Sequence, residues 1–295
     1  MIVDLQALRY FQAVAKAGSI SKAAREMNYA QSNLTARIQQ LESDLKTQLF
    51  YRHHRGTALT DKGKILLSYA EKIFQLLDEA QNVLSDDHTP RGPLAIGSME
   101  TTAAVRLPKW LSSFHRKYPE VDITIKTGPT EQHVAEVLNY ELDAAFVAGP
   151  IEHPELVSQT VAEEELVLVT DPLHRRLSFV KDIQHRTILV FRRGCSYRAR
   201  LEEWLRHEGI IPEKTMEFGT LDGIIGCVSA GLGVSLLPRS VVEKHVQDHR
   251  ILQHPIPERF AKVKTVFIYR KDQYVSLPLK RMIEMLKDEE RGLYM

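Results

Sequence analysis

The chain has 295 residues, of which 43% are hydrophobic and 26% charged, so it is long enough for roughly two domains with ordinary cores and is neither fibrous nor disordered. Two cysteines exclude a disulfide scaffold and a cysteine-rich zinc site. The first residues show no secretory signal, and the least polar stretch, 224–238, is interrupted by glycines and serines and is too short to cross a bilayer. These features predict a cytoplasmic protein with no membrane partner.

The net charge of +1 is unevenly distributed. Residues 1–60 contain eight Lys and Arg against four Asp and Glu, a net charge of +4, which leaves −3 for the rest of the chain. A basic end on a mildly acidic body is typical of a protein in which one part binds a polyanion. A solvated basic surface accounts for the same charges, so composition alone leaves both interpretations open.

Three helices are predicted in the first 45 residues. The first begins at the N-cap Asp4 and ends at Gly18, and a short second helix follows directly and ends near Met27. A third covers about 31–44, where apolar residues recur at intervals of four, three and four: Leu34, Ile38, Leu41 and Leu45. Two short helices followed directly by an amphipathic third are typical of a helix-turn-helix.

The third helix presents a polar face opposite its apolar stripe. At about 100° per residue, Ser32, Ala36 and Gln39 lie outermost, and amide, hydroxyl and guanidinium side chains flank them. Small outer residues let a helix enter the major groove, and the flanking groups match base-edge donors and acceptors. A polar solvent face, which most amphipathic helices have, is the alternative.

A basic turn follows the third helix. Residues 49–60 predict two short strands around a turn that holds Arg52 and Arg55, and no acidic residue lies between Lys46 and Thr60. Such a hairpin forms the wing of many DNA-binding domains, where basic side chains contact phosphates or enter the minor groove.

Several motifs follow one another in the first sixty residues: Leu8-Arg9-Tyr10-Phe11, Gly18-Ser19-Ile20-Ser21-Lys22-Ala23-Ala24, Gln31-Ser32-Asn33-Leu34-Thr35-Ala36-Arg37-Ile38, Leu41-Glu42, Leu49-Phe50-Tyr51-Arg52 and Leu59-Thr60-Asp61-Lys62-Gly63. In this order they resemble the N-terminal domain of LysR-type transcriptional regulators. The resemblance implies a winged helix-turn-helix that reads DNA as a dimer.

The resemblance also implies roles for individual residues. Gln31, Ser32 and Thr35 would face bases, and Arg52 and Arg55 would hold the DNA backbone. The full set of predicted DNA-binding residues is Gln31, Ser32, Asn33, Thr35, Arg37, Arg52 and Arg55. Two positions depart from the family: Ala30 stands where a capping Ser is common, and Ala36 stands where a basic residue is common.

A long helix is predicted after the wing, with Thr60 as its N-cap. Its apolar residues repeat as a heptad seam: Leu66, Ala70, Ile73, Leu77, Ala80 and Leu84. Pairing with the same helix of a second chain is the expected use of this seam, and the family resemblance favours it. The alternative is a helix packed on its own body. Prolines and a glycine in 89–93 then predict a hinge.

Beyond Pro93, segments with strand and helix patterns alternate, which predicts parallel, doubly wound α/β sheets. The strand candidates are Leu94–Ser98, Asp122–Lys126, Ala144–Ala148, Leu166–Thr170, Ile188–Phe191, Gly233–Leu237 and Val263–Tyr269. The helix candidates are Thr102–Tyr118, Glu131–Tyr140, Tyr197–Glu208, Asp222–Ala230 and Arg239–His245.

The family resemblance favours two lobes for this body, as in the bilobal periplasmic-binding-protein type of effector-binding domain. The predicted division of the chain is a winged helix-turn-helix in 1–60, a linker and dimerisation helix in 61–88, a hinge in 89–93, and an effector-binding domain in 94–295 with lobe 1 in about 94–162 and 266–295 and lobe 2 in about 163–265.

An effector cleft is predicted where strands end and helices begin, because ligands of open α/β sheets bind there. Four segments, 97–102, 127–130, 194–197 and 218–220, form the predicted cleft. They contribute the predicted effector-binding residues Ser98, Glu100, Thr101, Thr102, Gly128, Thr130, Cys195, Ser196, Tyr197, Gly219 and Thr220. Hydroxyls and helix N-termini suit a small anion such as a carboxylate, with Arg192 or Arg193 as a counter-charge. Ordinary helix capping explains any one segment, and Glu100 counts against an anion.

Catalytic patterns are weak in this sequence. It has no Gly-x-Ser-x-Gly, His-Glu-x-x-His or phosphate-loop motif, and Gly231-Leu232-Gly233 precedes a strand rather than following one. Cys195, beside Arg193 and Arg198, could have a lowered pKa and sense oxidants, but a plain small residue in the cleft wall is the preferred interpretation. His245 and His249 have no evident third ligand, so neither a metal nor a cofactor is expected.

Together these features predict a DNA-binding transcriptional regulator, not an enzyme. Its expected partners are double-stranded operator DNA, a small-molecule effector, a second copy of the chain in a homodimer or homotetramer, and RNA polymerase. The competing hypotheses are an enzyme with a fused helical module and a pure solute-binding protein. The missing catalytic motifs disfavour the first, and the basic N-terminal module disfavours the second.

Overall fold

The computed structural model describes residues 3–53, 56–84, 89–173, 183–271 and 275–293. The chain folds as two compact units, Met1–Asp87 and His88–Met295, called the N-terminal unit and the C-terminal unit. None of the described helices combines the length and the apolar character that a membrane crossing requires.

The N-terminal unit consists of α1 (Leu5–Ala17), α2 (Ile20–Glu26), α3 (Gln31–Asp44), β1 (Phe50–His53), β2 (Gly56–Leu59) and α4 (Asp61–Leu84). Local signals set most of these boundaries. Asp4 caps α1 by accepting a hydrogen bond from the Ala7 N–H at 2.6 Å, and Gly18 ends α1 at φ +64°. Thr60 caps α4 through the Gly63 N–H at 3.0 Å. As predicted, α3 has no side-chain cap at Ala30.

The core of the N-terminal unit joins the three short helices to the wing. Phe11, Leu34 and Ile38 are fully buried, and the rings of Phe11 and Phe50 lie 5.3 Å apart. Glu42 fastens α3 to the wing because its carboxylate accepts hydrogen bonds from the N–H groups of Leu49 and Phe50, at 2.8 and 3.2 Å. These hydrogen bonds therefore join the start of the wing to α3.

The predicted seam of α4 is used inside the chain. Ala70 is buried with Leu8 of α1, and Leu66, Ile73 and Leu77 pack against the same cluster. α1 thus supplies an apolar partner for this part of the seam within the chain, which is the alternative that the sequence left open, while Ala80 of the same seam is exposed. A different row of α4 is exposed: Ile65, Tyr69 and Leu76 are 54%, 57% and 60% accessible.

The C-terminal unit alternates strands and helices along the chain. Its first half contains β3 (Gly92–Ser98), α5 (Glu100–Val105), α6 (Leu107–Lys117), β4 (Val121–Thr127), α7 (Thr130–Leu138), β5 (Ala144–Ala148) and β6 (Leu156–Thr170). Its second half contains β7 (Thr187–Phe191), α8 (Ser196–His207), β8 (Lys214–Phe218), α9 (Leu221–Ser229), β9 (Ser235–Pro238), α10 (Arg239–Gln247), β10 (Leu252–Pro255), α11 (Glu258–Ala261), β11 (Lys262–Arg270) and α12 (Leu277–Leu293).

The sheet topology divides this unit into two lobes. Lobe 1 is built on the order β6-β11-β5-β3-β4, in which β3 lies parallel to β4 and β5 while β11 is antiparallel to both of its neighbours. In lobe 2, β9 and β10 pair with the far half of β6, and β7 pairs in parallel with β8. β6 pairs with β11 over 156–165 and with β9 over 166–169. This long strand therefore runs from one lobe into the other.

The prediction of purely parallel sheets is wrong for the strands that join the lobes. β6 is antiparallel to β9, β10 and β11. The prediction placed only the apolar 166–170 in a strand, because 156–165 includes Glu163, Glu164 and Glu165 and lacks a continuous apolar run.

The predicted helix 102–118 is two helices, α5 and α6, because Pro108 in the first turn of α6 cannot continue the α5 hydrogen-bond ladder. β8 and β10 were not predicted.

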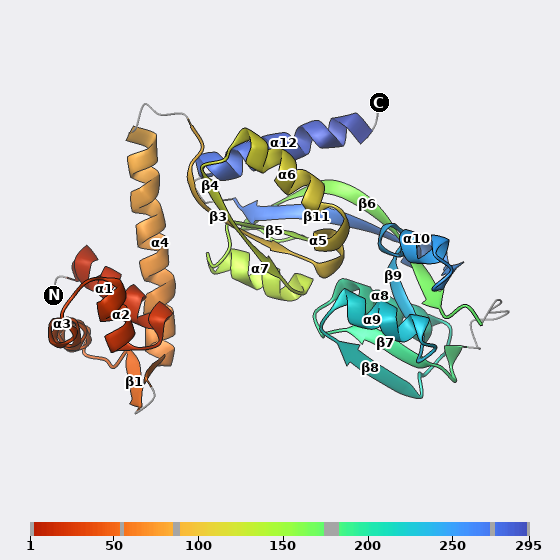
Figure 1. The fold of residues 1–295 in the computed structure, drawn as a ribbon, viewed down its shortest axis with the longest axis horizontal. Coiled ribbons are helices and arrows are strands. Elements are labelled where there is room, and N and C mark those ends of the chain that lie inside the picture. The colour runs from red at the N-terminus through yellow and green to blue at the C-terminus, as the bar shows by residue number, and fades with distance from the viewer. Residues whose placement is uncertain (1–2, 54–55, 85–88, 174–182, 272–274, 294–295) are drawn as a thin grey trace. The chain divides into compact units, whose positions relative to one another are not determined.

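Helices cover both faces of the lobe 1 sheet. On one face, α6 and α12 bury Trp110, Phe114 and Leu279 with the rings of Phe146 and Phe267, and α7 covers the opposite face (Figure 1). Alternate residues of β5 point to the two sides, which produces two separate apolar clusters. In lobe 2, residues of α8 and α9 share one cluster with β6, β7 and β9.

Candidate DNA-binding surface and ligand cavity

The predicted base-reading residues lie on the exposed side of α3. Gln31, Ser32, Asn33 and Arg37 are exposed and Thr35 is half-buried, whereas Leu34 and Ile38 between them are buried. This alternation follows from the 3.6-residue period of the helix. The structure therefore brings these five residues together on one helical surface.

Two of these side chains have neighbours inside the N-terminal unit. The Thr35 hydroxyl donates to the Gln31 carbonyl at 2.8 Å, which leaves its lone pairs as acceptors. The charge of Arg37 acts on the Tyr29 hydroxyl, and the ring of Tyr29 lies 5.1 Å from that of Tyr10. The Arg37 side chain therefore lies near the loop that precedes α3.

The wing is a two-stranded hairpin. Arg52 lies in β1, where its backbone pairs with Thr57, and Arg55 lies outside the described residues. The wing approaches the turn between α1 and α2 closely, since the Thr57 N–H donates to the Gly18 carbonyl at 2.9 Å. A side chain at Gly56 would overlap that carbonyl, with a Cβ only 2.5 Å from the oxygen, so the turn requires glycine there.

A cavity of about 270 Å³ lies between the two lobes of the C-terminal unit. It is lined by residues from both: Met99, Glu100, Thr101, Thr127, Gly128, Pro129, Thr130 and Gln132 from lobe 1, and Phe191, Arg192, Cys195, Tyr197, Phe218 and Gly219 from lobe 2. The lining follows the carboxyl ends of β3, β4, β7 and β8, the edge at which open α/β sheets bind ligands.

Seven of the predicted effector-binding residues line this cavity: Glu100, Thr101, Gly128, Thr130, Cys195, Tyr197 and Gly219. The other four do not. Ser98 and Thr102 are buried beneath it, Thr220 is exposed and caps α9, and Ser196 lines a neighbouring groove together with Arg193. Arg192, the other suggested counter-charge, does line the cavity.

Six further lining residues were not among the predicted effector-binding residues: Met99, Thr127, Pro129, Gln132, Phe191 and Phe218. Four of these six lie inside the segments predicted for the cleft, whereas Gln132 and Phe191 lie outside them. Thr127 and Pro129 flank the predicted Gly128, so the end of β4 was a usable signal for them. Phe191 ends a predicted strand, whereas Phe218 ends a strand that was not predicted. Nothing in the local pattern distinguishes either ring from a core residue.

The two lobes touch each other beside the cavity. The hydroxyls of Thr101 and Tyr197 lie 3.3 Å apart, and the Glu131 N–H donates to the Gly194 carbonyl at 3.4 Å. Burial raises the pKa of Tyr197, so its hydroxyl stays protonated and shares the hydrogen bond with Thr101. These contacts join the two lobes at the edge of the cavity.

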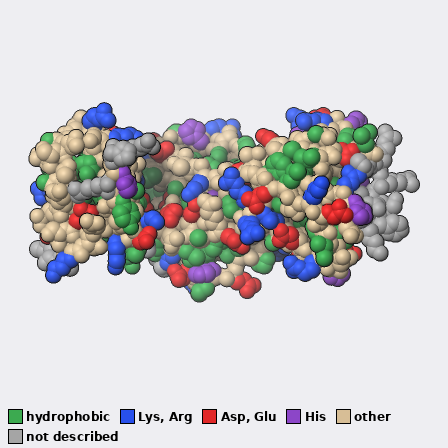
Figure 2. Space-filling model, turned by 90° about the horizontal axis from the view of Figure 1, so that it is seen from below, with side chains coloured by type: hydrophobic (Ala, Val, Ile, Leu, Met, Phe, Trp, Pro, Cys, Tyr) green, Lys and Arg blue, Asp and Glu red, His purple; other side chains and the backbone are tan. Residues whose placement is uncertain are grey.

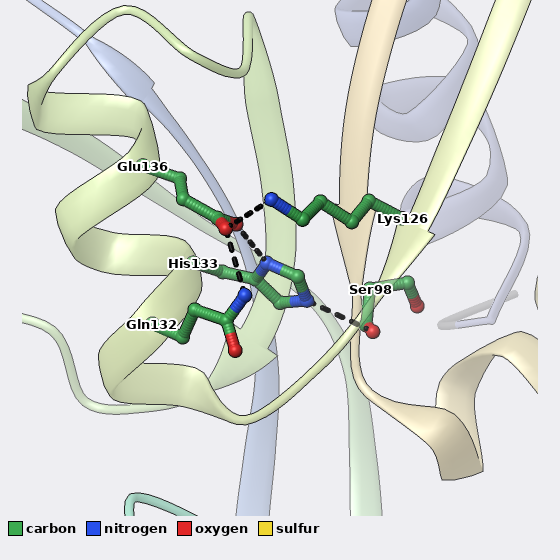
Figure 3. Close-up of polar contacts among 5 residues, drawn as sticks. All are labelled: Ser98, Lys126, Gln132, His133 and Glu136. Carbon is green, nitrogen blue, oxygen red and sulfur yellow. Dashed lines mark hydrogen bonds and ion pairs between the residues drawn. The ribbon is translucent and has the colours of Figure 1, made fainter. Parts of the chain in front are cut away.

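A buried polar network supports the lobe 1 wall (Figure 3). The fully buried His133 lies 2.8 Å through Nδ1 from Glu136 Oε2 and 3.1 Å through Nε2 from the Ser98 carbonyl. Both ring nitrogens thus face oxygen atoms that can accept a hydrogen bond. A Cβ at Gly97 would lie only 2.7 Å from the ring, which explains the glycine at this point of β3.

Glu136 is the acceptor at the centre of this network. Burial alone would raise the pKa of its carboxyl, but hydrogen bonds from Gln132, Lys126 and His133 outweigh burial and lower it. The carboxylate therefore stays ionised and fixes three donors, one of which, Gln132, lines the cavity.

The pKa of Cys195 is shifted in the direction opposite to that of a reactive thiolate. Burial raises its pKa above the ordinary value, against the lowered pKa that a redox sensor requires. The proximity of Arg198 is insufficient because that guanidinium is engaged by Glu202 at 2.8 Å and Glu217 at 2.6 Å. Cys195 thus fits the interpretation of a small wall residue.

On the face shown in Figure 2, acidic and basic side chains are interspersed. Across the described residues, no group of three His, Cys, Asp or Glu side chains has the arrangement of a metal site.

A winged helix with an exposed polar α3, in one chain with a two-lobed α/β unit that encloses a small cavity, defines a ligand-binding transcriptional regulator. Comparison with known proteins supports this class for both the winged helix and the two-lobed unit. Residues 5–64 match the family described as "Bacterial regulatory helix-turn-helix protein, lysR family", and residues 87–291 match "LysR substrate binding domain". The chain belongs to the LysR family of DNA-binding transcriptional regulators, with an effector-binding domain.

Relatives and solved structures cover nearly the whole chain. The HTH-type transcriptional regulator GltR of Bacillus subtilis is 52% identical over 286 residues, 97% of each protein. A full-length variant of OxyR from Pseudomonas aeruginosa has a similar fold, with a TM-score of 0.75 at 22% identity over 99% of this chain and 95% of that one. The structure of full-length CbnR complexed with its target DNA has a TM-score of 0.69 at 23% identity, over 97% of this chain and 100% of that one.

Proposed function

We propose that a small molecule bound in the cavity of the C-terminal unit switches the arrangement of paired winged helices on operator DNA. The observation that carries the proposal is the composition of the cavity wall, to which both lobes contribute directly. A ligand that contacts both lobes binds the closed arrangement better than an open one, and this difference in affinity is what couples binding to a conformational change. A carboxylate is one ligand class that Arg192 supports.

The DNA contacts are assigned to the polar side of α3 and to the wing. Gln31, Ser32, Asn33, Thr35 and Arg37 would read base edges or adjoin them, and Arg52 and Arg55 would hold phosphates. Exposure of the α3 residues and the missing side-chain cap at its N-terminus support this assignment, because free N–H groups and polar side chains are then available to DNA.

A homodimer or homotetramer would form through α4. The exposed apolar row Ile65, Tyr69 and Leu76 supports this, since its spacing of four and seven residues follows a heptad. Leu76→Glu should shift the purified protein to a monomer in light scattering, whereas Leu173→Glu, at an exposed residue of the C-terminal unit, should not. An unchanged mass for the Leu76 variant would exclude this row as the interface.

The proposed output is regulation of transcription through contact with RNA polymerase, rather than catalysis. The proposal includes a division of the chain into four parts: a DNA-binding domain in 1–60, a linker helix in 61–88, a hinge in 89–93 and a two-lobed domain in 94–295. The relatives' names support a regulator, because GltR is a transcriptional regulator by name. Turnover of a bound ligand by the purified protein would contradict this part of the proposal.

DNA binding is the direct test. The purified full-length protein should footprint two spaced half-sites in the DNA upstream of its own gene, with an affinity that falls as salt rises. Thr35→Ala should weaken this specific binding by about 10-fold, the typical effect of removing one base contact. Thr124→Ala, the same change on an exposed strand residue of the C-terminal unit, is the matched control. No specific binding anywhere in the genome by a folded dimer would overturn the proposal.

A further inference from the structure

Two side chains of opposite charge face the same cavity from opposite lobes. Glu100 belongs to lobe 1 and Arg192 to lobe 2, and both line the cavity. Neither side chain has a hydrogen-bonding or ion-pair partner among the described residues, and the two are not paired with each other. By contrast, other charged side chains around the cleft are engaged, including Lys126 with Glu136 and Arg198 with Glu202.

These two charges restrict the chemistry of the ligand. A simple carboxylate would pair with Arg192 but would bring a second negative charge into the space that Glu100 lines. A simple amine would pair with Glu100 but would bring a second positive charge close to Arg192. Where the ligand lies against these two side chains, a charge left without a partner is unfavourable and a like-charge approach is more so. A ligand with one positive and one negative group satisfies both side chains.

Gln132 adds an acceptor on the lobe 1 side. Its amide nitrogen donates to Glu136 Oε1 at 2.8 Å, and the reverse orientation would set its oxygen against a carboxylate. The amide oxygen must therefore point the other way, as Figure 3 shows, and it lies close to Gly128 in the cavity wall. The buried network thus presents an oxygen, not an NH₂ group, to the ligand.

We propose that the effector is a zwitterionic amino acid, with its ammonium held by Glu100 and the Gln132 oxygen and its carboxylate held by Arg192. This inference rests on the effector cleft of the proposed function. The cavity of about 270 Å³ is at the small end of ligand pockets, which commonly measure about 300–1,000 Å³, so it suits one amino acid rather than a peptide. Met99, Phe191 and Phe218 supply apolar walls for a side chain.

The first experiment titrates the purified full-length protein with each of the twenty proteinogenic L-amino acids by calorimetry. Every amino acid that binds is compared with its 2-oxo acid, which lacks the ammonium, and with its decarboxylated amine. The zwitterion should bind about 10- to 100-fold more tightly than either analogue, the usual range for losing a charged hydrogen-bonding partner. Equal or tighter binding of the 2-oxo acid or the amine would overturn the inference.

Variants at the two charges give a crossed test. Glu100→Gln should weaken the binding of the amino acid by about 10-fold or more and should remove the preference for the amino acid over the 2-oxo acid. Arg192→Gln should weaken the amino acid similarly and remove the preference over the amine. Glu152→Gln and Arg193→Gln make the same changes at exposed positions outside the cavity and should leave both preferences intact. If Glu100 and Arg192 had only a structural role, each variant would weaken the binding of the amino acid, the 2-oxo acid and the amine to the same extent.

The outcomes separate this inference from the proposed function. A protein that binds its operator specifically but binds none of the twenty amino acids refutes the zwitterion and leaves the regulator standing. Binding of an amino acid that Glu100→Gln and Arg192→Gln do not alter also refutes it. Failure of specific DNA binding refutes the proposed function, whatever the titrations give.

Discussion

The two units of this chain build their binding surfaces in different ways. In the N-terminal unit, five predicted DNA contacts fall within seven consecutive residues, 31–37, on the solvent side of one helix. In the C-terminal unit, the cavity draws on residues from Met99 to Gly219, contributed by strand ends, loops and the first turns of helices in both lobes. A helix face is specified by local periodicity, whereas a cavity of this kind exists only once distant strands have paired.

This difference has consequences for mutation. Exposed residues of α3 support little of the fold, so their replacement should change DNA affinity and leave the rest intact. The cavity wall rests on buried polar groups, including the His133 and Glu136 network, so changes behind it should alter both stability and ligand binding. Substitutions in each unit can test this contrast, beginning with the largest effect.

The largest effect is expected in the core of the N-terminal unit. Phe11→Ala should destabilise this unit by ~3–5 kcal/mol, because a fully buried ring is removed and a cavity remains. Calorimetry should show an early transition for the N-terminal unit while the C-terminal unit still unfolds at its wild-type temperature. Leu5→Ala, at a residue 44% exposed in the same helix, is the control. Joint loss of both transitions would show that the units do not fold independently.

The second effect is pH-dependent. Glu136→Gln should destabilise the C-terminal unit by about 2–3 kcal/mol at neutral pH, because the charged acceptor of three hydrogen bonds is lost. Its pKa is lowered by folding, so its contribution is fully present above the ordinary Glu pKa of 4.5 and disappears as pH falls through the folded-state value.

Wild-type and Glu136→Gln proteins should therefore converge in stability as the pH is lowered below about 4.5. Urea unfolding followed from pH 7 to pH 3 measures this convergence. A constant difference across that interval would mean that Glu136 does not titrate as a depressed carboxylate. Glu141→Gln, the same substitution at an exposed carboxyl of lobe 1, is the matched control.

A third prediction concerns the strand that joins the lobes. Glu164 of β6 accepts from Arg106 of lobe 1 at 2.6 Å and from Ser240 of lobe 2 at 2.7 Å. Glu164→Gln should cost ~1–2 kcal/mol, since one hydrogen-bonding acceptor becomes a donor and the ion pair is lost. Chemical denaturation should detect this. Glu163→Gln, on the exposed side of the same strand, should be nearly neutral. Equal effects at the two positions would argue against a specific link between the lobes.

The smallest effect is expected at the surface. Arg239 and Glu165 form a two-point contact, both at 2.8 Å, but their side chains are 42% and 50% exposed. Arg239→Gln should therefore change the free energy of unfolding by less than ~1 kcal/mol. The difference should shrink further in 1 M NaCl, where surface charges are screened. A larger, salt-independent loss would show that this pair acts with its neighbours as a network.

Much of the N-terminal unit could be predicted because its signals are local. The caps Asp4 and Thr60, the positive φ of Gly18 and the buried stripe of α3 each depend on residues within a few positions of one another. The use of the α4 seam could not be predicted, because the heptad does not say whether its partner is α1 or a second chain. Both satisfy the same apolar periodicity.

In the C-terminal unit the sequence by itself determined the alternation of strands and helices and the strand-end segments that hold Glu100, Gly128 and Tyr197. Only the tertiary structure decided which of them share a cavity. It excluded Ser98 and Thr220, added Phe191 and Phe218, and oriented Gln132 through Glu136. The reason is physical: side-chain period and capping act over a few residues, whereas strand pairing between β6 and β11 joins segments a hundred residues apart. Glu100 and Arg192 come to line the same cavity only after that pairing is complete.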